Sequence, residues 1–116
     1  MNISSNRHGN VDVVKLPQRL VMVNAPAVRK ELLEMIANDH HHLVLDLGNV
    51  SFVDSSGLSV LVSALKAADR VSGSVVLLNL TDVVRALVEL TRMHEVFHIF
   101  ADQQAAIDQL NQGVAA

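Results

Sequence analysis

Apolar residues occur in two kinds of block along this chain, and the two kinds alternate. Continuous runs at residues 43–47 and 75–78 predict strands that are covered on both faces, as in a parallel sheet. Apolar residues spaced three and four apart predict amphipathic helices, of which the clearest covers residues 55–70. The apolar stripe of that helix consists of Leu58, Leu61, Val62 and Leu65.

Residues that end strands or cap helices locate the remaining elements. Pro17 cannot donate a hydrogen bond to a neighbouring strand, so it ends the strand expected at residues 11–16. Asn24 and Thr81 have side chains that cap helices, and Asp102 begins a last helix. Further segments are a short strand at residues 96–100 and the apolar helix face Val28, Leu32, Met35 and Ile36. Strands that alternate with helices predict an α/β domain with a mainly parallel sheet.

Length and composition fit a single domain with a substantial core. The chain has 116 residues, 50% of which are hydrophobic, and they are spread along its whole length. We expect the domain to cover residues 11–112. Residues 1–10 form either a loosely ordered segment or a short edge strand, and residues 113–116 form a C-terminal tail.

Charge and residue usage argue against several classes of protein. The formal net charge is −3 and the only aromatic residues are 3 phenylalanines, whereas nucleic-acid binding needs a basic face and often stacking rings. No apolar run approaches the roughly 20 residues of a membrane-spanning helix, and the N-terminus has no signal-peptide pattern. Cysteine is absent, which removes disulfide and thiol chemistry. We therefore expect a cytoplasmic protein that binds neither nucleic acid nor membrane.

The segment Asp54–Leu58 carries the candidate chemistry, because it lies where a strand and its loop lead into the helix at residues 55–70. Aspartate and serine cap helices, since their side-chain oxygens accept bonds from the unpaired N–H groups of the first turn. A serine hydroxyl at this position is also well placed for phosphorylation, because the first-turn amides and the helix dipole stabilise an anion. From these residues alone, a purely capping role is the alternative.

The chain resembles the bacterial anti-sigma factor antagonists, which are single STAS domains. The resemblance lies in the motif Asp54-Ser55-Ser56-Gly57-Leu58, in the run Val50-Ser51-Phe52-Val53 before it, and in a strand that ends Leu45-Asp46-Leu47. Element order and spacing extend it from about Val11 to Leu110. It implies a STAS fold, in which a small mixed, mainly parallel sheet of roughly four to five strands packs with about four helices.

The same resemblance implies a mode of action. In this family the first serine of the motif is phosphorylated by a partner that is both a serine kinase and an anti-sigma factor, which makes Ser55 the expected acceptor. The unphosphorylated domain binds this partner, phosphorylation releases it, and a Ser/Thr phosphatase resets it. The domain is expected to be no enzyme and to need no cofactor. The expected partner-binding residues are Asp54, Ser55, Ser56, Gly57, Leu58, Leu20, Val21 and Met22.

Two other functions stay open at this point. The first is a STAS domain that acts as a constitutive interaction subunit of a larger complex, such as a transporter or signalling assembly, with Ser55 unmodified. The second is a module that binds a small molecule or nucleotide. Phosphate-sensitive gels with the kinase test the first, and calorimetry with nucleotides tests the second.

Two residues of the motif allow more than one interpretation. Ser56 is a second candidate acceptor, although the family pattern places it inside the turn. Gly57 either lets a partner approach the loop closely or packs tightly against a neighbouring strand, because it has no side chain.

Residues 20–23 are apolar in a position where loops are usually polar. They either complete the preceding strand or form an exposed patch for a protein partner, with Met22 as an adaptable contact. The family often has glycine and then aspartate in this loop, where Gln18 and Val21 stand here. This departure weakens the case for a nucleotide contact and leaves the phosphorylation motif intact.

Other chemistry finds little support. Three adjacent imidazoles, His40 to His42, do not converge readily on one metal ion, so a solvated loop is the expected state of residues 39–42. His8, His94 and His98 are isolated along the chain. A G-x-S-x-G elbow and a glycine-rich phosphate loop are both absent, which argues against hydrolase and nucleotide-cleaving chemistry.

Overall fold

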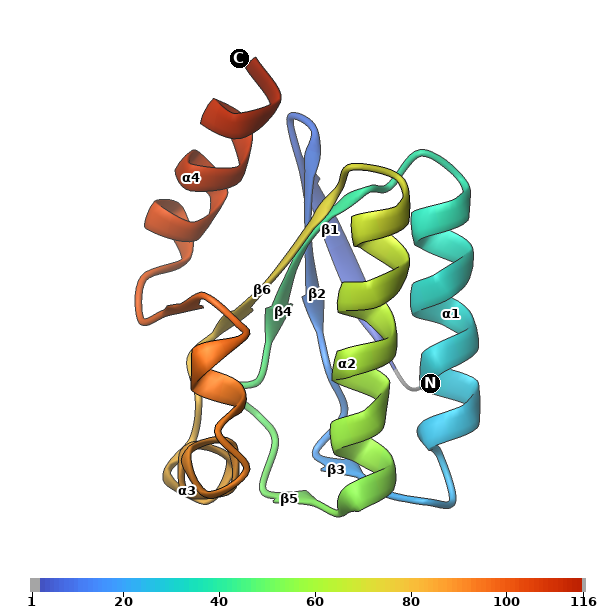
Figure 1. The fold of residues 1–116 in the computed structure, drawn as a ribbon, viewed down its shortest axis with the longest axis vertical. Coiled ribbons are helices and arrows are strands. Elements are labelled where there is room, and N and C mark those ends of the chain that lie inside the picture. The colour runs from blue at the N-terminus through green and yellow to red at the C-terminus, as the bar shows by residue number, and fades with distance from the viewer. Residues whose placement is uncertain (1–2, 116) are drawn as a thin grey trace.

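A computed structural model describes residues 3–115, including the side chains of residues 3–112. At least one strand separates each α-helix from the next along it, as the apolar pattern predicts (Figure 1). The elements are β1 (Ser4–His8), β2 (Val11–Lys15), β3 (Arg19–Leu20), α1 (Ala25–Ala37), β4 (His42–Asp46), β5 (Phe52–Val53), α2 (Ser55–Arg70), β6 (Ser74–Leu78), α3 (Asp82–Leu90), the short 3-10 helix η1 (Met93–Glu95), β7 (Ile99–Phe100) and α4 (Gln103–Ala115).

The main sheet has five strands in the order β1-β2-β4-β6-β7. β1 is antiparallel to β2, and every other neighbouring pair is parallel. The expected α/β class, with a mixed and mainly parallel sheet, is confirmed. β3 and β5 form a separate parallel ladder, in which Arg19 pairs with Phe52 and Leu20 with Val53.

Two hydrophobic cores lie on opposite faces of the main sheet. Alternate residues of β2, β4 and β6 point to α1 and α2, and the residues between them point to α4. Figure 1 shows α1 and α2 side by side on one face and α4 on the other. Burial on both faces explains why the apolar residues of β4 and β6 form continuous runs.

Helix α2 has the expected ends, Ser55 and Arg70, but turns a different face inward. Its buried residues are Gly57, Val60, Leu61, Ala64 and Ala68. Of the expected stripe only Leu61 is buried, whereas Leu58, Val62 and Leu65 are partly exposed at the flank of the core. Glycine and alanine contribute little to an apolar pattern, yet their small size lets α2 lie close to α1 and β6.

Thr81 caps α3 as expected, and Asp102, which was expected to begin the last helix, caps α4. Thr81 Oγ1 accepts a hydrogen bond from the Val84 N–H at 3.4 Å, and Asp102 Oδ2 accepts one from the Ala105 N–H at 2.9 Å. Asn24 does occupy the position before α1, but its side chain makes no cap there.

Asn24 turns back to the loop instead. Its Oδ1 accepts the Val21 N–H at 2.9 Å, and its Nδ2 donates to the Arg19 carbonyl at 2.7 Å. The expected cap is therefore wrong, because this side chain braces residues 19–24 rather than the first turn of α1.

Both ends of the described chain belong to regular elements. Residues 4–8 form the edge strand, which was one of the two alternatives for the N-terminus. α4 continues through residues 113–115, so these residues extend a helix rather than form a tail, and residue 116 lies outside the described part. No helix within residues 3–115 is both long and apolar enough to cross a membrane.

Candidate functional site

Asp54 joins two segments of the site through one carboxylate. It precedes the first residue of α2, and its Oδ1 accepts a hydrogen bond from the Gly57 N–H at 3.0 Å, which confirms the expected cap. Its Oδ2 accepts the Met22 N–H at 2.9 Å, from the loop after β3. The bond from Gly57 above all, followed by that from Met22, holds the pKa of Asp54 below its ordinary value, because both bonds favour the ionised carboxylate.

Ser55 is the first residue of α2, and it is exposed. Ser56 is partly buried, and its carbonyl accepts a hydrogen bond from the Ser59 hydroxyl at 2.9 Å. Exposure therefore favours Ser55 over Ser56 as an acceptor of phosphate. A phosphate on Ser55 would lie at the positive end of the α2 dipole, next along the chain to the Asp54 carboxylate.

Gly57 leaves no room for a side chain. A Cβ at this position would overlap the carbonyl oxygen of Leu20 and lie 2.9 Å from Val53 Cγ1. Both neighbours belong to the β3–β5 ladder, which lies against the first turn of α2. The structure therefore supports the second interpretation of Gly57, which is tight packing against a neighbouring strand. Gly57 is buried, so it positions the site without forming part of its surface.

Residues 20–23 divide into a buried and an exposed part. Leu20 is fully buried, so the expectation that its side chain meets a partner is wrong. Val21 is partly buried, whereas Met22 is 70% exposed and Val23 is 90% exposed. Both interpretations of the segment are therefore partly right, because Leu20 completes a short strand and the next residues present an apolar surface.

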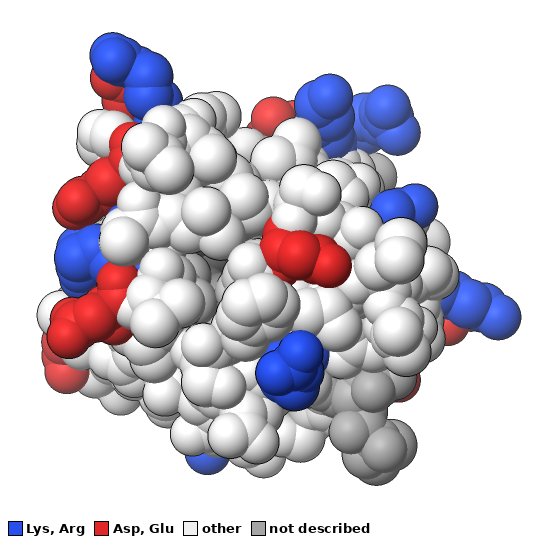
Figure 2. Space-filling view, turned by 90° about the horizontal axis from the view of Figure 1, so that it is seen from below, with Lys and Arg blue, Asp and Glu red and all other residues white. Residues whose placement is uncertain are grey.

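Phe52 and Arg19 enlarge this surface, and sequence reasoning does not find them. Phe52 is 46% exposed, and the guanidinium carbon of Arg19 lies 5.0 Å from the centre of its ring, a cation–π arrangement. Their pairing across the β3–β5 ladder places them together. Figure 2 views this end of the molecule, where charged side chains gather toward the margin and few lie in the middle.

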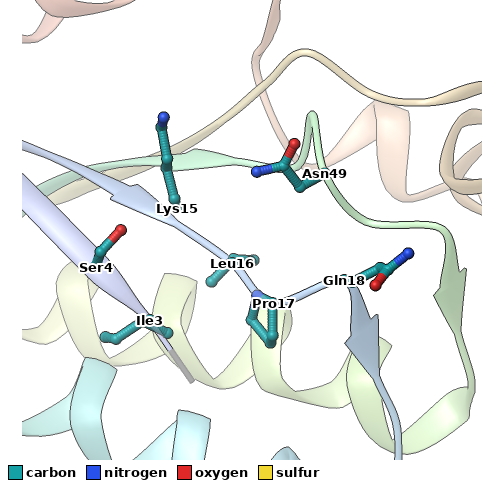
Figure 3. Close-up of a pocket in the computed structure, with 7 residues that line it drawn as sticks. All are labelled: Ile3, Ser4, Lys15, Leu16, Pro17, Gln18 and Asn49. Carbon is teal, nitrogen blue, oxygen red and sulfur yellow. The ribbon is translucent and has the colours of Figure 1, made fainter. Parts of the chain in front are cut away.

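A cavity of about 540 Å³ lies beside Gln18, in the loop before β3 (Figure 3). Figure 3 shows Lys15, Gln18 and Asn49 around it, with Leu16 and Pro17 between them. The described residues that line it include no aromatic ring to stack on a base, and Val21 is not among them. The cavity therefore gives no specific support to a nucleotide site at the positions where the chain departs from the family pattern.

His40 makes a contact that the expectation of a solvated loop misses. Its Nδ1 lies 2.8 Å from Asp12 Oδ2 and 2.8 Å from Arg7 Nη1. Nδ1 cannot make both bonds at once, because it donates to the carboxylate only when it carries a proton and accepts from the guanidinium only when it does not. The bond to Asp12 is favoured, because a buried carboxylate needs a hydrogen-bond donor. The side chain of Asp12 is 4% exposed. His40 therefore ties the loop before β4 to β2, and the expectation is wrong at this residue.

His41 and His42, the other two histidines of the run, belong to no cluster of metal ligands among the described residues. Burial, followed by the neighbouring His41, lowers the pKa of His42, which favours the neutral form of this ring. Among the residues with described side chains, no three histidine, aspartate or glutamate groups lie together as metal ligands would.

Comparison with known proteins places this geometry in a family. The STAS domain family matches residues 2–106. An anti-sigma-B factor antagonist of Staphylococcus epidermidis is 26% identical over 99 residues, which cover 85% of this chain and 92% of the relative.

Solved structures share the fold. The anti-sigma factor antagonist SpoIIAA in its unphosphorylated form has a TM-score of 0.83 at 20% identity, covering 95% of this chain and 96% of that one. The Bacillus cell fate determinant SpoIIAA in its phosphorylated form has a TM-score of 0.74 at 19% identity, covering 92% and 97%. Because the family match spans nearly the whole chain and includes the Asp54–Leu58 segment, this protein belongs to the STAS domain family.

Proposed function

We propose that this protein is a phospho-regulated anti-sigma factor antagonist that works by partner switching. In its unphosphorylated state it binds an anti-sigma factor that is also a serine kinase. Phosphorylation of Ser55 releases it, and a Ser/Thr phosphatase returns it to the binding state. The observation that carries the proposal is an exposed serine at the first position of α2, next to a carboxylate that fixes the neighbouring loop.

Charge at the site supports this mechanism. A phosphoserine adds about −1.5 to −2 charges at neutral pH. The N-terminus of α2 accommodates an anion, so we expect the fold to change little. The partner, in contrast, meets a concentration of negative charge from the phosphate and Asp54, which weakens binding by repulsion and by steric overlap. A relative named as an antagonist, and SpoIIAA structures in both states, agree with this assignment.

The proposed contact surface combines Ser55 with the exposed apolar side chains beside it. Met22 and Val23 extend from the loop that Asp54 holds, and Phe52 lies under Arg19 on the adjacent ladder. Aromatic, methionine and arginine side chains are enriched in protein interfaces. The surface is therefore suited to a protein partner, and Ser55 follows Asp54, the residue that holds the Met22 loop.

The proposal needs no catalytic group in this chain, because the kinase and the phosphatase supply the chemistry. The test is to incubate the purified protein with ATP and each anti-sigma factor kinase of its own organism, and to locate phosphate by mass spectrometry. We expect one phosphate, on Ser55, which is absent in Ser55→Ala and present in Ser56→Ala.

Two results would redirect the proposal. Phosphate on Ser56 would make Ser56, rather than Ser55, the acceptor. A kinase-like partner that binds tightly but never phosphorylates the protein would instead favour a constitutive interaction subunit.

A further inference from the structure

A second cavity, of about 620 Å³, lies beside the amino-terminal half of β6. It exists because β7 is short and pairs with β6 only through Leu77 with Ile99 and Leu78 with Phe100. Residues 74–76 of β6 therefore have no paired strand on this side. The cavity lies near the C-terminal end of α2, roughly 20 Å along the helix from Ser55, since each helical residue rises about 1.5 Å.

The lining of the cavity is about equally polar and apolar, and its apolar side chains come from three layers of the fold. Val75 and Val76 of β6 form its floor, Leu65 comes from α2 and Leu110 from α4. Because α2 and α4 lie on opposite faces of the sheet, the cavity reaches around the sheet edge. Val96 lines its rim and is 62% exposed, so an apolar side chain stands in water at the entrance.

One end of the cavity is acidic. Asp69 lines it from the last turn of α2, and no salt bridge among the residues with described side chains involves this carboxylate. The negative end of the α2 dipole lies here as well, and Arg70, the basic residue of the last turn, is not part of the lining. The other polar side chains of the lining are Ser74, His98 and Gln109, and no lysine or arginine contributes to it.

We propose that this cavity binds a small amphipathic cation, with the chemistry of an aliphatic amine. Its ammonium group would pair with Asp69 while its chain lies against Leu65, Val75 and Leu110. The volume falls within the range of about 300–1,000 Å³ that is typical of small-molecule sites. Charge complementarity selects the class, because a carboxylate of the same length would face Asp69 and the negative end of α2. The site is independent of phosphorylation at Ser55.

The test is a set of NMR titrations of the full-length 15N-labelled protein with hexylamine, hexanol and hexanoate at one pH and ionic strength. We expect saturable shifts of amides around the cavity, such as Leu65, Val75 and His98, with hexylamine binding more tightly than hexanol and hexanoate binding least. Val96→Trp should block the entrance and abolish binding. Val83→Trp is the matched control, because Val83 is exposed on α3 outside the cavity and should bind as the wild type does.

A second pair of variants tests the charge. Asp69→Asn should weaken hexylamine binding about two- to fivefold and leave hexanol binding unchanged, because an exposed ion pair contributes only modestly. Glu89→Gln removes a carboxylate outside the cavity and should change neither. Three results would each overturn the inference: no saturable shifts with hexylamine, hexanoate binding as tightly as hexylamine, or unchanged hexylamine binding in Val96→Trp. Thermal unfolding of each variant confirms that it is folded before it is titrated.

Discussion

The carboxylate of Asp54 holds the backbone of Met22. One of its oxygens accepts the Met22 N–H at 2.9 Å, while the other accepts the Gly57 N–H at 3.0 Å in the first turn of α2. One side chain, that of Asp54, therefore accepts hydrogen bonds from both segments. These are the loop that carries Met22 and Val23 and the helix that begins with Ser55. Asn24 braces the same loop at its other end. A modification at Ser55 therefore acts beside the residue that sets the shape of the proposed contact surface.

Replacing Asp54 with asparagine should destabilise the protein and loosen this loop. Asparagine has one acceptor oxygen instead of two, so it cannot keep the bonds to both Gly57 and Met22. We expect a lower urea midpoint and faster hydrogen exchange at the Met22 amide. Asp82→Asn, in the first turn of α3, is the control and should leave Met22 exchange unchanged. If Met22 exchanges equally slowly in Asp54→Asn, Asn24 alone holds the loop.

The same carboxylate should make stability depend on pH. The pKa of Asp54 is lower in the folded protein than in the unfolded chain, so its contribution is fully present above the unfolded value of about 3.9. That contribution is lost as pH falls through the folded pKa. The difference in unfolding free energy between the wild type and Asp54→Asn should be constant above about pH 5 and shrink in more acidic solution. Urea unfolding at a series of pH values measures it, and a difference that grows on acidification would contradict the assignment.

Substituting alanine for Gly57 should destabilise the protein by about 1–3 kcal/mol, because the added Cβ must displace the Leu20 carbonyl or Val53. The direction of the change in stability is informative, because replacing glycine with alanine within a helix usually stabilises a protein by about 0.5–1 kcal/mol. Urea unfolding gives the free energy. Ser56→Ala, one residue earlier, should have an effect close to zero. A stabilised Gly57→Ala variant would mean that the β3–β5 ladder can move away from α2.

The fold was predictable because its main elements are long or strongly patterned. The buried runs of β4 and β6 and the capped helix α2 each carry their own local signal. Asp54 as a cap is also a local property, so the sequence indicates it directly. The predicted buried face of α2 differs from the observed one because the observed face includes Gly57, Ala64 and Ala68. Such small residues contribute little to an apolar pattern.

The rest of the site depends on contacts between distant segments. Strands β3 and β5 have two residues each, too few for any period, yet their pairing buries Leu20, exposes Phe52 and brings Met22 to Asp54. The bond between His40 and Asp12 likewise joins two segments that are far apart in the chain. Local patterns contain no information about either pairing.

Removing the imidazole of His40 should test that second pairing. Asp12 is buried, and His40→Ala takes away its nearest side-chain donor, which should cost about 1–3 kcal/mol. Arg7→Ala should cost less, because its guanidinium lies 3.7 Å from the carboxylate. Urea unfolding of both single variants and the double variant separates the two effects. His94→Ala removes an exposed histidine and should be neutral. Equal stability of His40→Ala and the wild type would show that Arg7 alone satisfies Asp12.

Placing glutamate at Ser55 should reproduce the released state of the proposed switch. The side chain is exposed at the N-terminus of α2, where a carboxylate is tolerated or mildly stabilising, so the circular dichroism spectrum and unfolding midpoint should change little. Affinity for the anti-sigma factor kinase should fall about tenfold or more, because a like charge brought into an interface is costly.

Ser55→Gln separates charge from size in this experiment, since glutamine has the shape of glutamate without its charge. Calorimetric titration of the kinase should show a large loss of affinity for Ser55→Glu and a small one for Ser55→Gln. Equal losses in both variants would make steric overlap the cause of release. Wild-type affinity in both would mean that Ser55 does not control binding, and a constitutive interaction subunit would then explain the exposed surface of Met22, Val23 and Phe52 better than a phospho-switch does.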